Sequence, residues 1–216
     1  MAAGPTETIA RKVADLRERK GLTKQELGDA LTELGVSWNR FTVSSLENGK
    51  RQNLSVTEWL ALARALDVAP LTLLLPLGEA DEIEVLPGLP VHPDLVRQWI
   101  VGEEQAVNEQ GYTVGDSVFW SRHTEPLRLY SRLPVAQEAV RGAKSALRIA
   151  ESVGREEAVT RAREANVGAL RQLADILKDM SGASIRPPAL PASWLDEMVE
   201  LGMLDAVHGL PQVKEG

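Results

Sequence analysis

Residues 22–51, LTKQELGDALTELGVSWNRFTVSSLENGKR, carry the signals that decide the fold. Thr23 is followed three residues later by Glu26, so the hydroxyl and the carboxylate can each accept a hydrogen bond from the other residue's backbone N–H. This pattern predicts a helix that starts after Thr23. Asn39 is a preferred residue at the N-cap position. The stretch therefore predicts two helices joined by a turn, with the second helix starting after Asn39.

The second predicted helix leaves an unusual surface exposed. Val43 and Leu46 fall on its buried side, and the remaining positions supply an arginine, an aromatic ring and small hydroxyls, with no acid before Glu47. Such a face suits a DNA major groove, which offers hydrogen-bond acceptors and thymine methyl groups. The residues expected to read base edges are Arg40, Phe41, Thr42, Ser44 and Ser45. In the alternative interpretation, Phe41 packs into the core and the serines have no specific role.

Three neighbouring segments extend this pattern: LRERKGLT at 16–23, LENGKR at 46–51 and LALARALDV at 60–68. Together with Glu26 and Leu27, they resemble, in this order, the helix-turn-helix of the Cro and phage-repressor type. This group is also called the xenobiotic-response-element family, and the form seen here is frequent among actinobacterial regulators. The resemblance implies an all-α, lambda-repressor-like domain of five helices over residues 1–76 that binds double-stranded DNA.

The resemblance also implies roles for individual side chains. Arg17 and Glu47 occupy positions that form a partly buried ion pair between the first helix and the recognition helix. Lys24 at the start of the second helix, and Asn48 and Lys50 after the recognition helix, occupy positions that contact phosphate. We expect Arg51 to add to this attraction.

One departure from the family pattern concerns the turn. Compact members join the two helices by a shorter segment than residues 32–38 provide here. If Ser37 were the N-cap, Trp38 and Asn39 would join the face that reads DNA. The family's spacing, counted back from residues 46–49, favours Asn39 as the cap.

The charge distribution sets limits on binding to a polyanion. The net charge is −7, but residues 1–76 hold ten Lys or Arg against nine Asp or Glu, and the remainder holds fourteen against twenty-two. Because the predicted DNA-binding part is nearly neutral, attraction to phosphate depends on where a few cations and helix ends lie. We expect modest non-specific affinity and pronounced salt sensitivity.

The rest of the chain divides into an acidic, Pro- and Gly-rich linker at residues 77–92 and a helical C-terminal domain at 93–216. Within that domain, residues 135–180 keep apolar side chains at helical spacing. We expect one long helix there, with a hairpin broken at Gly154 as the alternative. The apolar stripe suggests that a second copy of the chain covers it, unless the flanking helices do so in an intramolecular bundle.

Composition argues against several other classes. The chain has no cysteine, no signal-peptide-like start and no apolar run long enough to span a membrane, so we expect a soluble, cytoplasmic protein. Its three histidines, His92, His123 and His208, have no metal-ligand spacing, and no nucleotide-binding or nucleophile motif is present. We expect neither an enzyme nor a bound cofactor or metal.

Together these features predict a sequence-specific transcriptional regulator, more specifically a repressor that binds an inverted-repeat operator as a homodimer. The alternative is an antitoxin-like interaction protein whose C-terminal helices bind another protein. For the aromatic residues within 111–133, the favoured interpretation is packing against the long helix, and the alternative is a pocket for a small effector.

Overall fold

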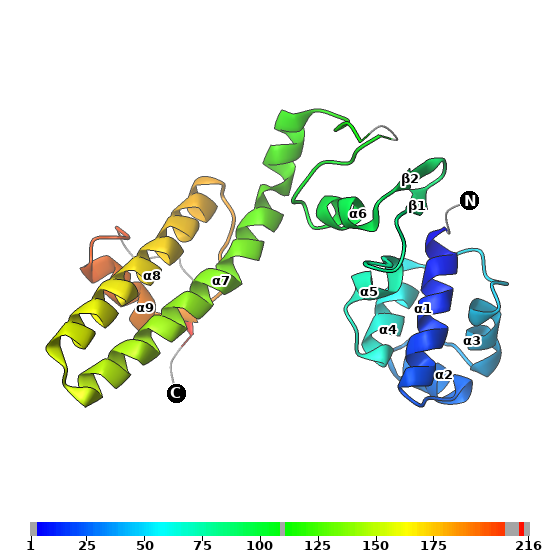
Figure 1. Cartoon of the computed structure of the whole chain (residues 1–216), viewed down its shortest axis with the longest axis horizontal. Helices are drawn as coiled ribbons and strands as arrows, with labels where there is room; N and C mark the ends of the chain where they lie inside the picture. Colours follow the sequence, from blue (N-terminus) through cyan, green and yellow to red (C-terminus); the bar gives the residue numbers. More distant parts are fainter. Residues whose placement is uncertain (1–3, 109–110, 206–211, 214–216) are drawn as a thin grey trace. The chain divides into compact units, whose positions relative to one another are not determined.

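The computed structural model describes residues 4–108, 111–205 and 212–213. The chain divides into two compact units, Met1–Asp116 and Ser117–Gly216 (Figure 1). Helices dominate both units, so the predicted all-α class is confirmed. His208, one of the three histidines, lies outside the described residues.

The first unit contains the five expected helices, gathered around one core. They are α1 (Pro5–Arg19), α2 (Lys24–Glu33), α3 (Arg40–Glu47), α4 (Val56–Leu66) and α5 (Pro70–Leu74). Each contributes side chains with essentially no solvent exposure. These residues are Val13, Leu27, Leu31, Val43, Leu46, Leu62 and Leu73. Because every helix is short, its stability comes mainly from this shared apolar burial rather than from helix propensity.

The predicted capping signals determine where the helices start. The Thr23 hydroxyl accepts a hydrogen bond from the Glu26 N–H at 3.1 Å, and the Glu26 carboxylate accepts one from the Thr23 N–H at 2.7 Å. Ser55 and Glu58 form the same reciprocal pair ahead of α4. Backbone N–H groups that lack partners in the first helical turn are thereby satisfied.

Residues 77–92, the predicted linker, include regular secondary structure. They contain a two-stranded antiparallel hairpin, β1 (Ile83–Leu86) and β2 (Leu89–Val91), followed directly by α6 (Pro93–Ile100). Ile83 is buried together with Leu75 and Val96. This small apolar cluster joins the hairpin and α6 to the end of α5, and all of these elements belong to the first unit.

The second unit is built on a helical hairpin, and the expectation of one long helix is wrong. Helix α7 (Ser117–Val153) and helix α8 (Glu156–Gly182) run side by side in opposite directions (Figure 1). Gly154, between them, has φ = 74°. Only glycine adopts this left-handed conformation without steric cost. The helix therefore ends at Val153 and the chain reverses.

The hairpin also shows how most of the apolar stripe is covered. Helix α9 (Ala192–Glu200), which follows β3 (Leu190–Pro191), packs on α8; β3 pairs in parallel with β4 (Gln212–Val213). The buried side chains include Leu133, Val140, Leu170, Leu173, Leu177, Met180, Leu195 and Met198. This is the intramolecular alternative, so the stripe does not require a second copy of the chain.

The first half of α7 was not predicted from sequence. Pro126 and Pro134 lie inside the helix. Each lacks the backbone N–H that would donate to the carbonyl four residues earlier. In sequence, prolines argue against a helix interior, and residues 111–133 also show no clear apolar period. The packing of Leu129 and Leu133 in the core of the second unit stabilises a helix across both prolines.

The turn at Gly154 generates a stability prediction. Gly154→Ala is expected to lower the free energy of unfolding by about 1 kcal/mol, because the Cβ of alanine is strained in the left-handed conformation. Gly142 is a matched control, since it lies exposed within α7 and an added Cβ meets nothing within 4 Å. Gly142→Ala should raise stability by roughly 0.5–1 kcal/mol. Thermal unfolding followed by circular dichroism measures both, and equal shifts in the same direction would contradict this account.

Candidate nucleic-acid interface

Helix α3 presents the surface expected to face DNA. Its N-cap is Asn39, whose Oδ1 accepts hydrogen bonds from the N–H groups of Phe41 and Thr42 at 2.9 and 3.1 Å. The preferred register therefore holds. Val43 and Leu46 are fully buried, whereas Phe41 is 69% exposed. The alternative in which Phe41 packs into the core is wrong.

The remaining predicted base-reading side chains share this accessible side. Arg40 is exposed, and Thr42, Ser44 and Ser45 are partly exposed. The Arg40 guanidinium lies 4.7 Å from the centroid of the Phe41 ring, a cation–π distance. Stacking restricts the arginine to fewer conformations, so the first turn of α3 displays an aromatic ring and a planar set of donors as one unit.

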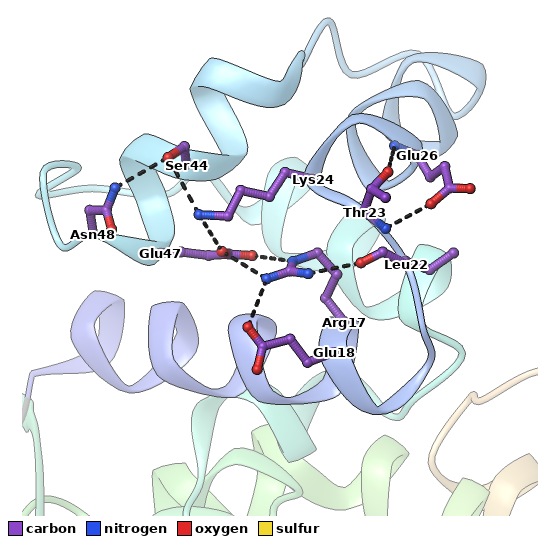
Figure 2. A network of polar contacts seen from close by, with 9 residues as sticks. All are labelled: Arg17, Glu18, Leu22, Thr23, Lys24, Glu26, Ser44, Glu47 and Asn48. Carbon is purple, nitrogen blue, oxygen red and sulfur yellow. Dashed lines mark hydrogen bonds and ion pairs between the residues drawn. The ribbon is translucent and has the colours of Figure 1, made fainter.

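The predicted ion pair between α1 and α3 is present in the structure (Figure 2). Arg17 Nε donates to Glu47 Oε1 at 2.6 Å, and Arg17 Nη2 donates to Glu47 Oε2 at 3.1 Å. Both side chains are nearly out of solvent, at 8% and 5% exposure. Arg17 also donates to the Leu22 carbonyl at 2.8 Å and to Glu18 at 3.2 Å. One guanidinium thus links α1, the turn before α2, and α3.

This environment shifts both ionisation equilibria of the pair. Burial by itself would raise the pKa of Glu47, but hydrogen bonds and charge from Arg17 and Lys24 outweigh it and hold that pKa below its usual value. The hydrogen bond to Glu47 raises the pKa of Arg17, despite the opposing effect of burial. Both groups therefore stay charged at neutral pH, and α3 is anchored by a bidentate, charge-assisted contact.

Lys24 and Asn48, two of the predicted phosphate contacts, join the same network. Lys24 Nζ lies 3.0 Å from Glu47 Oε2 and 3.4 Å from Ser44 Oγ, and Asn48 Nδ2 donates to Ser44 Oγ at 3.2 Å (Figure 2). Ser44 therefore lies between an ammonium group and an amide. The charge of Lys24 is partly neutralised by Glu47, although its side chain remains 37% exposed.

Lys50 and Arg51 differ in their surroundings. The Lys50 N–H donates to the Ser45 carbonyl at 2.9 Å, which closes the end of α3 and places the exposed lysine directly after it. Arg51 instead pairs with Glu58 at 2.8 Å and stacks on the Trp38 ring at 4.7 Å. Among these two cations, Lys50 is the more accessible to a phosphate.

Trp38 has a structural role that the sequence did not reveal. Its ring is buried at 5% exposure, and its Nε1 donates to Glu58 Oε1 at 2.9 Å. Trp38 therefore lies beneath the turn before α3. The alternative register, which required Trp38 on the exposed face, is wrong. Glu58 accepts from both Trp38 and Arg51, and so connects the segments on either side of α3 to α4.

Gly28 and Gln25 are two further residues that sequence reasoning missed. A Cβ added at Gly28 would lie 2.9 Å from the carbonyl carbon of Asn39, closer than real contacts allow. The absence of a side chain thus lets α2 approach the start of α3. Gln25, exposed at the first turn of α2, lines a surface depression of about 380 Å³ with Lys24, Arg40 and Phe41. Its place beside Lys24 in the sequence was the available signal.

The geometry defines a helical domain in which a short second helix is held against a first and shows its outer face to solvent. Residues 8–75 match the family model described as a helix-turn-helix domain. Neither the comparison with curated proteins nor that with solved structures finds a match. The chain thus contains a helix-turn-helix domain at residues 8–75. The Cro and phage-repressor subtype and the actinobacterial form stay predictions.

Two other features are absent from residues 4–108, 111–205 and 212–213. None of the helices in these ranges is long and apolar enough to cross a membrane. No group of three or more His, Asp or Glu side chains in them is arranged to hold a metal ion.

The buried ion pair generates a pH prediction. Because the pKa of Glu47 is lower in the folded state, its stabilisation is complete above the unfolded value, about pH 4.3, and is lost as pH falls through the folded value. Glu47→Gln should cost roughly 3 kcal/mol at neutral pH, since Arg17 keeps two other partners. The free energy of unfolding of the Glu47→Gln variant should also fall less steeply than that of the wild type as pH decreases from about 5 to about 3.

The matched control is Glu18→Gln, which removes an exposed carboxylate from the same arginine. It should cost less than about 1 kcal/mol. Denaturant unfolding of the full chain across the pH series measures both variants. Equal losses, or an unchanged acid slope in Glu47→Gln, would refute the assignment of this pair as the anchor of α3.

Gly28 generates a packing prediction. Gly28→Ala should destabilise the chain by about 1–3 kcal/mol, because the new methyl group forces α2 away from Asn39. Gly168→Ala is the control, since Gly168 lies exposed in α8 with nothing within 4 Å of an added Cβ. It should stabilise by roughly 0.5–1 kcal/mol. Thermal unfolding compares the two, and a neutral or stabilising Gly28→Ala would contradict the close approach.

Proposed function

We propose that this protein is a sequence-specific DNA-binding transcriptional regulator, and more specifically a repressor. The observation that carries the proposal is the outer face of α3, where a highly exposed Phe41 and a stacked Arg40 project from a helix anchored by a buried ion pair. A partner that covers the Phe41 ring would remove its apolar surface from water, which is favourable. The match of residues 8–75 to a helix-turn-helix domain supports DNA as that partner.

The chemistry of α3 suits the major groove. A guanidinium donates two parallel hydrogen bonds to guanine O6 and N7, and an aromatic ring contacts the methyl group of thymine. Arg40 and Phe41 are proposed for these roles, with hydroxyls of Thr42, Ser44 and Ser45 reaching neighbouring base edges. Because Arg40 and Phe41 are stacked, a guanine next to a thymine is the step that they fit best.

Phosphate contacts are proposed for Lys24, Asn48, Lys50 and Arg51. Lys24 and Arg51 already share their charge with Glu47 and Glu58, so Lys50 should supply the largest part of the attraction. Since the first unit is nearly neutral overall, these contacts hold the domain in register without strong non-specific binding.

A homodimer on an inverted repeat is the proposed binding form. A single small reader makes few base contacts, and a two-fold arrangement doubles them. Half-sites would then lie about one helical turn of DNA, roughly 34–36 Å, apart or a multiple of it. Repression follows if such an operator overlaps a promoter.

Selection of bound duplexes from a random library with the full chain tests the proposal. An inverted repeat should be enriched, and a reporter promoter that contains it should be less active when the protein is present. A single half-site motif would contradict the homodimer, and increased expression would contradict repression. No enriched sequence at moderate salt would overturn the DNA-binding proposal and favour the partner-binding alternative.

Variants of the interface sharpen this test. Arg40→Ala and Phe41→Ala should each lose about 1–3 kcal/mol of discrimination against a substituted base at one position of the site. Lys50→Gln should weaken binding to all sequences and reduce the salt slope by about one. Arg64→Gln, which removes an exposed cation from α4, serves as the charge control. Equal effects of Arg64→Gln and Lys50→Gln would contradict the assigned interface.

A further inference from the structure

The second unit contains a polar cavity that the proposed DNA contact does not use. Its volume is about 540 Å³, within the usual range for small-molecule sites. It lies among three helices: α7 contributes Arg141, Lys144 and Arg148, α8 contributes Asn166, and the start of α9 contributes Trp194 and Glu197. All of these belong to one compact unit.

Asn166 is the unusual residue of this cavity. It is 2% exposed, and its Nδ2 donates to Glu197 Oε1 at 2.7 Å. Its Oδ1 is buried and has no hydrogen-bond partner among the residues that the structure describes. Buried acceptors of this kind are normally satisfied. Because Asn166 lines the cavity, a bound ligand is the candidate donor for this acceptor.

The basic side chains define a second requirement. Lys144 pairs with Glu197 and Arg141 pairs with Glu138, whereas Arg148 forms no ion pair within the described part of the chain. Helix α9 begins after Pro191 without a side-chain cap, so the positive end of its dipole is not offset there. These features favour an anionic group near Arg148.

The acidic side chains limit what else the ligand carries. Glu197 holds both Lys144 and Asn166, and Glu151 lies 3.7 Å from Arg163. A purely anionic ligand would meet two carboxylates and leave Asn166 Oδ1 without a partner. A ligand with one carboxylate and one donor group satisfies both parts of the cavity.

We propose that this cavity binds a small carboxylate that also carries an ammonium or hydroxyl donor. Its carboxylate contacts Arg148 near the start of α9, and its donor reaches Asn166 and Glu197. Trp194, at the cavity wall, covers the apolar part of the ligand. This binding site does not depend on DNA recognition, so either proposal can fail without the other.

The test uses the full chain with L-amino acids, the matching hydroxy acids, the matching acids that lack both donors, acetate and inorganic phosphate. A thermal-shift screen comes first, because a ligand that binds the folded state raises the unfolding temperature. Calorimetry and tryptophan fluorescence then measure affinity. We expect saturable binding of an amino or hydroxy acid, weaker by at least about tenfold for the acid without the donor.

Arg148→Gln should weaken this binding by at least about tenfold, and Asn166→Leu should reduce the difference between the ligand and its donor-free analogue. Arg171→Gln, an exposed arginine of α8 outside the cavity, should leave binding unchanged. Arg148 is exposed, so its variant tests the site even if Asn166→Leu fails to fold. Three results would overturn the proposal. They are no saturable binding of any amino or hydroxy acid, binding of acetate or phosphate as tight as that of the amino or hydroxy acid, and binding that Arg148→Gln does not weaken.

Discussion

The contact between Arg17 and Glu47 determines how α3 is held. Both groups are nearly excluded from water, and they join α1 to α3 across thirty positions of the chain through two hydrogen bonds. Helix α3 has only eight residues, too few to be stable alone. Its direction therefore depends on Val43 and Leu46 in the core and on this ion pair at its end. The exposure of Phe41 and Arg40 on the opposite side is a consequence of that anchoring.

Neighbouring carboxylates divide the cations around α3 into two kinds. Lys24 and Arg51 lie against carboxylates and help to hold the domain together, whereas Lys50 extends from the end of the helix. A nearly neutral domain can in this way keep a local positive charge where a phosphate would lie. A separate set of contacts joins Trp38 and Arg51 to Glu58 of α4, so the segments on both sides of α3 are fixed to the same core.

The second unit buries most of its apolar side chains within one chain. Gly154 ends α7, and the reversal brings the apolar side of α8 onto that of α7, with α9 packed on α8. Polar side chains gather at one place along this bundle, where Lys144, Asn166 and Glu197 connect the three helices. A polar cluster is costly to bury unless each of its groups is satisfied, which is why the open acceptor of Asn166 stands out.

The sequence by itself determined the features that act over a few residues. The pairs Thr23 with Glu26 and Ser55 with Glu58, and the cap at Asn39, predicted helix starts because their hydrogen bonds lie within one turn. The side of α3 that carries Phe41 followed from helical spacing, and the Arg17–Glu47 contact came only from the family resemblance.

Only the tertiary structure decided the rest, because each feature depends on residues far apart in the chain. The burial of Trp38 requires α4, the need for glycine at position 28 requires the backbone of Asn39, and the place of residues 77–92 requires Leu75 and Val96. The choice between a long helix and a hairpin at Gly154 was likewise made by packing, since both share the same apolar periodicity and only the hairpin buries it within one chain.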